Sequence, residues 1–312
     1  MNTSSLPERF AQLHPTEKSL ISILALMGPT DTRSRLIEYL AKAGLKSPKG
    51  TGYNIQGIST LLTELMLLNL VEQSPADNYC CPADLVETAI GYVVSTGQLE
   101  KLCSAIQSSE HFYDRGGYVS FNNYAQGIRL LRLAMLQGLD RAAVQKYLIP
   151  CANFSDFRKQ HPYVHICGEP FHPGFMALLH PEMQEVVTAT LLQNSMLGLH
   201  NAQPIVAYAQ ALFKSKAPGT HYAVFIAMYA EHALLSGQFK QVEDLLVNRL
   251  EGSCVAVHSA VELLRGDLDV AIDGFEAALK AFRATSAKRT SVYSGLVGFL
   301  HMLALLRSPN EK

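Results

Sequence analysis

The sequence is poor in charged residues and has no strong excess of either sign. Asp, Glu, Lys and Arg make up 17% of the 312 residues, against a usual share of about 25%. The formal net charge is −1, which excludes a globally basic nucleic-acid-binding protein but permits local basic patches. So lightly charged a surface suggests that a partner outside this chain covers part of it.

The sequence also lacks targeting and membrane-spanning patterns. The first ten residues show no basic segment followed by an apolar one, as a signal peptide would. The longest apolar run, residues 295–306, is short and contains His301, so no spanning helix is expected. The six cysteines form no Cys-x-x-Cys pair and are expected to be reduced core residues. These observations predict a cytoplasmic protein that has no cofactor and no contact with membranes.

What the sequence does have is helical periodicity, most clearly in residues 253–282. Two amphipathic helices are predicted there, joined at Gly266. The second carries an apolar stripe with steps of four, three, four and three residues, formed by Leu268, Ile272, Phe275, Leu279 and Phe282. A single hairpin cannot cover such a stripe, so neighbouring hairpins must do so. The pattern therefore predicts an all-α stack of helical hairpins.

The turn of that hairpin has counterparts elsewhere. Gly97, Gly237 and Gly266 are each followed by a polar residue and then an apolar one. Glycine adopts the left-handed conformation of such a turn at the lowest cost. The spacing of 29 residues from Gly237 to Gly266 is shorter than the regular tetratricopeptide repeat of about 34 residues. Residues 81–312 are therefore predicted to form a degenerate tetratricopeptide-like helical repeat domain. Its further helices are expected near residues 123–148, 182–214, 218–236 and 288–306.

The first 80 residues are predicted to form a separate, winged-helix-like domain. Pro15 opens a helix that Gly28 ends, Asp31 can cap a second helix, and Asn54 can cap a third. The third helix should turn apolar residues inward: Ile58, Leu61, Leu62, Leu65 and Leu68. Two short strands around a polar turn follow, at residues 70–73 and 79–81. The order helix, helix, helix, strand, turn, strand resembles a winged helix-turn-helix.

In a winged helix the third helix usually enters the major groove of DNA. Its outward face here would present Gln56, Thr60 and Thr63, without Arg or Lys. The candidate phosphate-binding cations lie elsewhere, at Arg33, Arg35, Lys42, Lys46, Lys49, Lys288 and Arg289. We expect at most weak DNA binding with little sequence preference. The alternative is that these are solvated charges on a domain used for packing.

Residues 150–181 are predicted to be an irregular crossover rich in proline and histidine. Its five prolines exclude a long helix. Weak candidates for zinc ligands gather in it, namely His161, His165, Cys167 and His172. Glu169 could serve acid-base chemistry beside His172, but no nucleophile motif accompanies it. A packed irregular segment explains the same residues equally well.

Two other segments match known motifs only in part. Residues 44–50 contain glycines and lysines but lack the Gly-Lys-Ser/Thr ending of a phosphate loop. Residues 115–118, Arg-Gly-Gly-Tyr, are expected to form a turn and not an RNA-binding box. No catalytic residue can be assigned, and the chain is predicted not to be an enzyme.

A family resemblance is carried by the carboxyl-terminal run. It comprises Glu-Leu-Leu-Arg-Gly-Asp-Leu at residues 262–268, Phe-Glu-Ala-Ala-Leu-Lys at 275–280, Lys288-Arg289, and the apolar residues that follow. This run resembles the amino-terminal region of large bacterial Swi/Snf-related helicases. The resemblance is best after about residue 170. A weaker resemblance is to regulators of the STAND type, which place a winged helix before similar repeats.

The helicase resemblance implies a non-catalytic regulatory or docking module, with the ATPase motor beyond Lys312. Its partner would be a protein, or the remainder of a larger polypeptide, with DNA as a weak second ligand. The acidic edge of the carboxyl-terminal hairpin favours a basic partner surface; it consists of Glu262, Asp267, Asp269, Asp273 and Glu276. The alternatives are a free-standing winged-helix transcriptional regulator or adaptor, and a metal-dependent enzyme built on the crossover.

Overall fold

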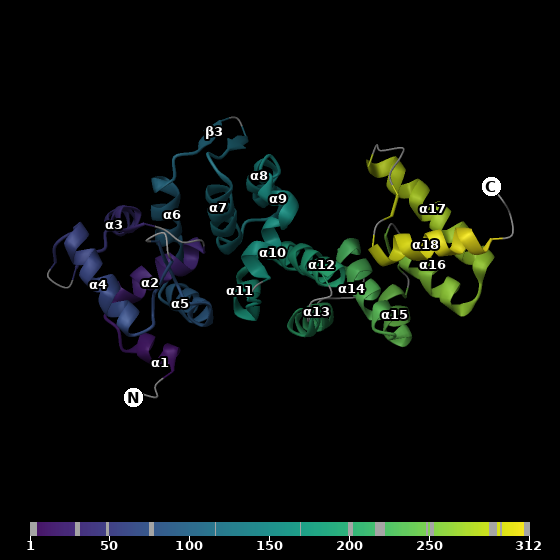
Figure 1. Cartoon of the computed structure of the whole chain (residues 1–312), viewed down its shortest axis with the longest axis horizontal. Helices are drawn as coiled ribbons and strands as arrows, with labels where there is room; N and C mark the ends of the chain where they lie inside the picture. The colour runs from purple at the N-terminus through teal and green to yellow at the C-terminus, as the bar shows by residue number, and fades with distance from the viewer. Residues whose placement is uncertain are drawn as a thin grey trace. The chain divides into compact units, whose positions relative to one another are not determined.

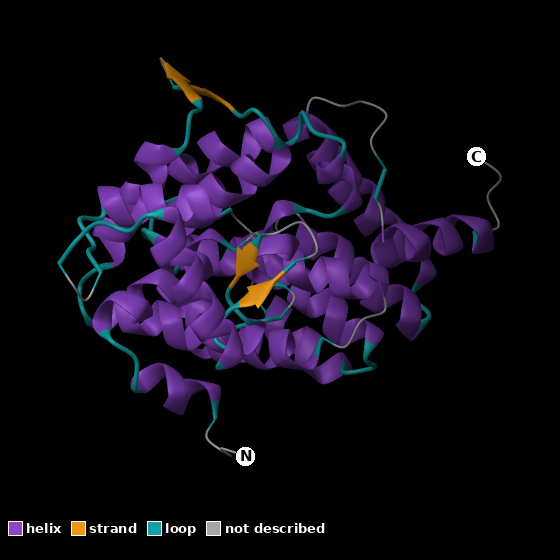
Figure 2. Ribbon diagram, turned by 60° about the vertical axis from the view of Figure 1, so that its left-hand side comes forward, coloured by secondary structure: helices purple, strands orange, loops and turns teal. Residues whose placement is uncertain are grey.

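The computed structural model describes most of the chain. The described residues are 5–28, 32–47, 50–74, 78–115, 117–168, 170–198, 202–215, 222–247, 249, 253–286, 292–293 and 295–308. The structure is 74% helix and 4% strand, with 18 helices in the described part. The strands form two short antiparallel pairs, drawn in orange in Figure 2. The predicted all-α class is confirmed. Among the described residues, no helix is both long and apolar enough to cross a membrane.

The chain divides into two compact units, Met1–Met183 and Gln184–Lys312. The domain boundary predicted at residue 80 thus lies inside unit 1. The elements of unit 1 are α1 (Leu6–Ala11), α2 (Pro15–Met27), α3 (Arg33–Lys42), α4 (Ile55–Leu67), β1 (Glu72–Gln73), β2 (Tyr79–Cys80), α5 (Ala83–Ser95), α6 (Leu99–Ser109), β3 (Tyr113–Arg115), β4 (Tyr118–Ser120), α7 (Tyr124–Leu136), α8 (Arg141–Cys151), α9 (Asp156–Lys159), α10 (Pro162–Cys167) and α11 (Pro173–Leu178).

Helix α2 explains why unit 1 extends past residue 80. Every residue from Ser19 to Met27 is buried, because the segment is apolar on all sides and must be covered on all sides. Helices α3, α5, α6 and α7 all contact α2. The Ser22 hydroxyl donates to the carbonyl of Ala89 in α5, at 2.9 Å. The first two predicted helices, α2 and α3, therefore share a core with helices that follow residue 80.

From α2 to β2 the elements follow the order predicted for the first 80 residues, and the short helix α1, which was not predicted, precedes them. Helix α2 begins at Pro15 and ends before Gly28. The Asn54 side chain caps α4 by accepting from the Gly57 amide, at 2.7 Å. Strand β1 pairs antiparallel with β2. Two details differ. Thr32 takes the N-cap position of α3, while Asp31 lies outside the described residues. Leu68 is 42% exposed because α4 ends at Leu67.

The second half of unit 1 contains a hairpin and a set of short helices. Strands β3 and β4 pair antiparallel around the turn expected at residues 115–118, where Gly117 has a φ of 83°. Helix α8 contains Pro150. Three short helices, α9, α10 and α11, follow it, and both α10 and α11 begin at a proline. The prolines exclude a long helix, as expected, but short helices occupy much of the crossover.

Unit 2 is a series of helices. They are α12 (Pro181–Gly198), which starts three residues before the division, α13 (Gln203–Ser215), α14 (Ala223–Leu235), α15 (Phe239–Leu246), α16 (Ser253–Arg265), α17 (Leu268–Ser286) and α18 (Gly295–Arg307). Figure 1 shows α16, α17 and α18 side by side, and all three pairs are in contact. The three predicted turn glycines, Gly97, Gly237 and Gly266, have φ values of 67°, 69° and 99°. The predicted left-handed turns are confirmed.

The predicted stripe of α17 is mostly inward. Phe275 and Leu279 are buried, and Leu268 and Ile272 are half-buried. Phe282 is 42% exposed, so its predicted burial is wrong. It lies near the end of α17, beside Tyr293 at a ring-centroid distance of 5.9 Å, and borders a pocket.

Candidate functional site

The predicted basic residues of the head contact groups within the chain. Arg35 forms an ion pair with Glu110 at 2.5 Å, and Arg129 meets the same carboxylate at 2.9 Å. Burial alone would raise the pKa of Glu110, but Arg35 and Arg129 hold this pKa below its ordinary value. Tyr39 and Gln126 also donate to the carboxylate. Arg35 is therefore part of a buried network in unit 1.

The other predicted phosphate contacts differ in their surroundings. Lys42 donates to the carbonyl of Ser108 at 2.6 Å and pairs with Glu38 at 3.0 Å. Arg33 donates to the Ser59 hydroxyl at 3.3 Å. Lys46 is exposed. Three further candidates, Lys49, Lys288 and Arg289, lie outside the described residues. Of the candidates in the described part of the chain, Arg33, Arg35 and Lys42 thus each have a partner within unit 1.

The outward face of α4 is polar in part. Gln56, Thr60 and Thr63 are exposed, as expected. The hydroxyls of Thr60 and Thr63 donate to the carbonyls four residues earlier in the same helix. Ile55 and Leu67 are 63% and 79% exposed, so this face also carries apolar side chains.

The weak metal candidates do not form a ligand set. Among the described residues, no three His, Cys, Asp or Glu side chains are placed to hold one ion. His161 accepts from the Tyr163 amide and so caps α10. Cys167 is buried, and burial raises its pKa to about 12. His165 and His172 line a cavity of unit 1. Glu169 lies outside the described residues.

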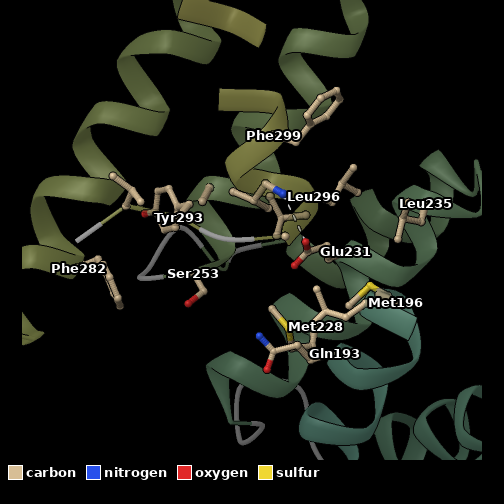
Figure 3. Close-up of a pocket in the computed structure, with 16 residues that line it drawn as sticks. Gln193, Met196, Met228, Glu231, Leu235, Ser253, Phe282, Tyr293, Leu296 and Phe299 are labelled. Carbon is tan, nitrogen blue, oxygen red and sulfur yellow. Dashed lines mark hydrogen bonds between the residues drawn. The ribbon is translucent and has the colours of Figure 1, made fainter. Parts of the chain in front are cut away.

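Unit 2 contains a pocket of about 560 Å³, drawn in Figure 3. Helices α12, α14, α16 and α17, the start of α18 and residues 292–293 supply its walls. Most of its lining side chains are apolar, and the principal ones are Met196, Leu197, Met228, Leu235, Phe282, Tyr293, Leu296 and Phe299. Leu235 and Phe299 are 50% and 55% exposed. The pocket is therefore an open, largely apolar hollow.

One acidic side chain, Glu231 of α14, lies in the wall of this pocket and is 5% exposed. Its Oε1 accepts from the amide of Val297 at 3.3 Å, marked in Figure 3. Glu231 thus caps the first turn of α18, where helix amides lack partners. Burial raises the pKa of Glu231, although the amides of Val297 and Leu296 oppose this. No basic side chain in the described part of the chain pairs with Glu231.

Two glycines lie in the first turn of α18. Gly295 has a φ of 73°, and a Cβ at this position would lie 3.4 Å from Oε1 of Glu231. A Cβ at Gly298 would lie 2.3 Å from the Tyr293 carbonyl oxygen, which is too close for any side chain. These glycines let the backbone approach Glu231 and Tyr293 closely. The site therefore combines methionine and aromatic walls with one buried carboxyl group.

The acidic edge predicted on the carboxyl-terminal hairpin is largely solvent-facing. Asp267, Asp269, Asp273 and Glu276 are exposed. Arg265 pairs with Glu262 at 2.9 Å and also with Glu243. None of the five acidic residues of this edge lines the pocket of unit 2.

Sequence reasoning missed Glu231 and Arg132 as site residues. Glu231 is the only acidic residue of α14, which is otherwise mainly apolar. Arg132 lies in α7, where every residue from Gln126 to Leu136 is buried. In both cases the useful signal was a charged residue inside a mainly apolar helix, two of them in α7, because such a residue is expensive to bury without a partner.

A comparison of this chain with protein-family models, curated proteins and solved structures finds no match.

Proposed function

We propose that this protein is a non-catalytic interaction module, in which the pocket of unit 2 receives a segment of a partner polypeptide. The partner segment carries an apolar side chain next to a lysine or arginine. The observation that carries this proposal is the buried Glu231 carboxyl, which no described cation pairs with, in an otherwise apolar pocket.

The apolar walls support a hydrophobic occupant. The volume of about 560 Å³ falls within the range of about 300 to 1,000 Å³ that ligand sites occupy. Met196 and Met228 line it, and methionine side chains adapt their shape to different apolar groups. The exposed Leu235 and Phe299 would lose contact with water when a partner binds, which favours association.

The carboxyl group supports a basic neighbour on the same segment. Burial raises the pKa of Glu231 because the charged form loses hydration. A cation entering the pocket would replace that hydration with an ion pair and with charge-assisted hydrogen bonds. An acidic partner group would instead be repelled, so Glu231 selects the sign of the partner's charge.

The wider setting proposed for the module is the accessory region of a cytoplasmic, DNA-translocating helicase-like ATPase. The element order of α2, α3, α4, β1 and β2 supports a winged-helix-like head. The glycine turns at Gly97, Gly237 and Gly266 support a tetratricopeptide-like repeat.

Site-specific crosslinking tests the proposed partner chemistry. A photo-crosslinking phenylalanine analogue replaces Phe299 at the rim of the pocket, and a control variant carries it at Leu67 of α4, which is also exposed. After crosslinking in cells, mass spectrometry identifies the attached peptide. We expect the Phe299 variant to capture segments with a large apolar residue next to Lys or Arg. Capture of acidic segments, or the same segments at Leu67, would contradict the proposal.

A further inference from the structure

Helix α7 contains two buried arginines with different surroundings. Arg129 is 5% exposed and meets the carboxylate of Glu110 at 2.9 Å. Arg132, almost one turn later, is 7% exposed. Among the described residues, no carboxylate pairs with Arg132. An arginine buried without an opposite charge is costly, so Arg132 requires a separate explanation.

The Arg132 guanidinium is held in a fixed position. Its Nη1 donates to the carbonyl of Ile166 at 3.1 Å, and its Nη2 donates to the carbonyl of Ala25 at 3.0 Å. The group lies over the ring of Phe175, at 4.7 Å from the centroid. The Nε atom is buried and has no hydrogen-bond partner. Burial lowers the pKa of Arg132 to about 10, so the group remains charged at neutral pH.

Arg132 lines a cavity of about 510 Å³ in unit 1, together with Gly28, His165 and His172. A Cβ at Gly28 would lie 3.1 Å from Cδ and 3.3 Å from Nε of Arg132, so the absence of a side chain there lets the arginine lie close against the backbone. The Nε2 atom of His172 is also buried and has no partner. Two side chains that line this cavity, Arg132 and His172, therefore each carry a buried nitrogen that lacks a hydrogen-bond partner.

The titratable groups near this cavity do not balance the charge of Arg132. Burial lowers the pKa of His165 and of His172, and the charge of Arg132 lowers both further. Of the nearby acids, Glu72 is exposed at the wall. Asp84 and Glu87 are exposed and raise the pKa of His172. The Glu87 carboxylate accepts from the amide of Gly174, at 2.5 Å. The thiols of Cys81 and Cys167 also face Arg132, and burial raises their pKa values. None of these groups supplies a paired negative charge to the guanidinium.

We propose that this cavity binds a small oxyanion, either a phosphate or a carboxylate group. One oxygen accepts from Nε of Arg132, and a second accepts from Nε2 of His172. The bound charge replaces the missing counter-charge of the buried guanidinium. Binding also favours the protonated form of His172, so affinity rises as the pH falls from 7.5 to 6.

Calorimetric titration and thermal unfolding test this proposal with sodium phosphate, sodium malonate and sodium chloride at matched ionic strength. We expect an oxyanion to raise the melting temperature above the value in chloride. Nitrogen-15 NMR of the arginine Nε–H groups should show one resonance that shifts with the same affinity. Binding of phosphate alone assigns a phosphoryl ligand, and binding of malonate alone assigns a carboxylate ligand.

The variant His172→Gln keeps Arg132 and its two carbonyl bonds, so the core that they hold stays intact. We expect this variant to bind the oxyanion about tenfold or more weakly, as for loss of a hydrogen bond to a charged group. Its affinity should also no longer depend on pH. The control His111→Gln changes an exposed histidine of unit 1 and should bind like the wild type. Equal melting temperatures in all three salts, or equal affinities for wild type and His172→Gln, would overturn the proposal.

Discussion

The phenyl ring of Phe275 stacks on the imidazole of His301, with centroids 5.0 Å apart and ring planes 24° apart. This contact joins α17 to α18 in the core of unit 2. Phe275 is fully buried, and burial lowers the pKa of His301. The neutral imidazole therefore acts as an aromatic packing surface for the stripe of α17.

Truncation of this contact should destabilise unit 2. Phe275→Ala is expected to lower the free energy of unfolding by about 3 to 5 kcal/mol, because it removes a buried ring and leaves a cavity. The measurement is urea denaturation followed by circular dichroism. The control Val270→Ala changes a 59% exposed residue of the same helix and should cost about 0.5 kcal/mol or less. A loss near zero for Phe275→Ala would mean that the stripe does not form the core.

Loss of charge at Glu110 should destabilise unit 1. Glu110→Gln leaves Arg129 buried without an anion, so we expect a loss on the order of 3 kcal/mol. The control Glu38→Gln breaks an exposed pair with Lys42 and should cost less than about 1 kcal/mol.

The same network gives a pH dependence with a defined sign. The pKa of Glu110 is lower in the folded protein than its ordinary value of 4.5. Its contribution to stability is therefore complete above pH 4.5 and disappears as the pH falls through the folded value. Urea denaturation at pH 3 and pH 6 should show a smaller difference between wild type and Glu110→Gln at pH 3. A constant difference would contradict the charged network.

Much of the helical framework could be predicted from the sequence, because local rules determine it. Pro15 begins α2, Asn54 caps α4, and Gly266 forms the left-handed turn before α17, each as predicted. The spacing of three and four residues between apolar side chains also correctly predicted that Phe275 and Leu279 are buried. These features depend on backbone geometry and periodicity within about twenty residues.

The site and the division into units could not be predicted in this way, because both depend on contacts between distant segments. Glu231 meets the Val297 amide across 66 residues. Arg132 meets Ala25 across 107 residues. Arg35 was predicted to be a surface charge that could bind phosphate. The neighbouring sequence does not indicate that Glu110 lies beside it in the fold. Contacts between residues so far apart in the sequence cannot be inferred from hydrophobic periodicity.

The raised pKa of Glu231 predicts a pH dependence of stability in unit 2 that is opposite in sign to that of Glu110 in unit 1. The folded state favours the neutral carboxyl, so its stability contribution is present below the ordinary value of 4.5 and is lost as the pH rises through the folded value. Glu231→Gln keeps an oxygen to cap α18 but cannot ionise. Urea denaturation should show the variant gaining stability relative to wild type between pH 4 and pH 7. The control Glu276→Gln, at an exposed site, should show no such gain.

Nucleic-acid binding stays a prediction, and a salt titration tests it. Because Arg35 and Lys42 have partners within the chain, we expect duplex DNA to bind weakly, with a Kd of about 10⁻⁴ to 10⁻⁶ M at physiological salt. The measurement is fluorescence anisotropy of labelled duplex at 50 and 200 mM salt. A variant with Lys46, Lys49, Lys288 and Arg289 changed to Glu should bind less. Equal binding by the two proteins, or no salt dependence, would rule out phosphate contact by these residues.

The most direct test of the proposed pocket is NMR of methionine methyl groups labelled with carbon-13. Met196 and Met228 line the pocket, and their signals are assigned with Met196→Leu and Met228→Leu. The probes are n-hexylammonium, n-hexanol and n-hexanoate, which share a chain and differ in charge. In the wild type we expect the ammonium to bind about tenfold or more tightly than the alcohol, because it pairs with Glu231, and hexanoate to bind most weakly. Glu231→Gln should remove the preference for the ammonium. Equal affinities for ammonium and alcohol in the wild type, or a preference that survives in Glu231→Gln, would contradict the account.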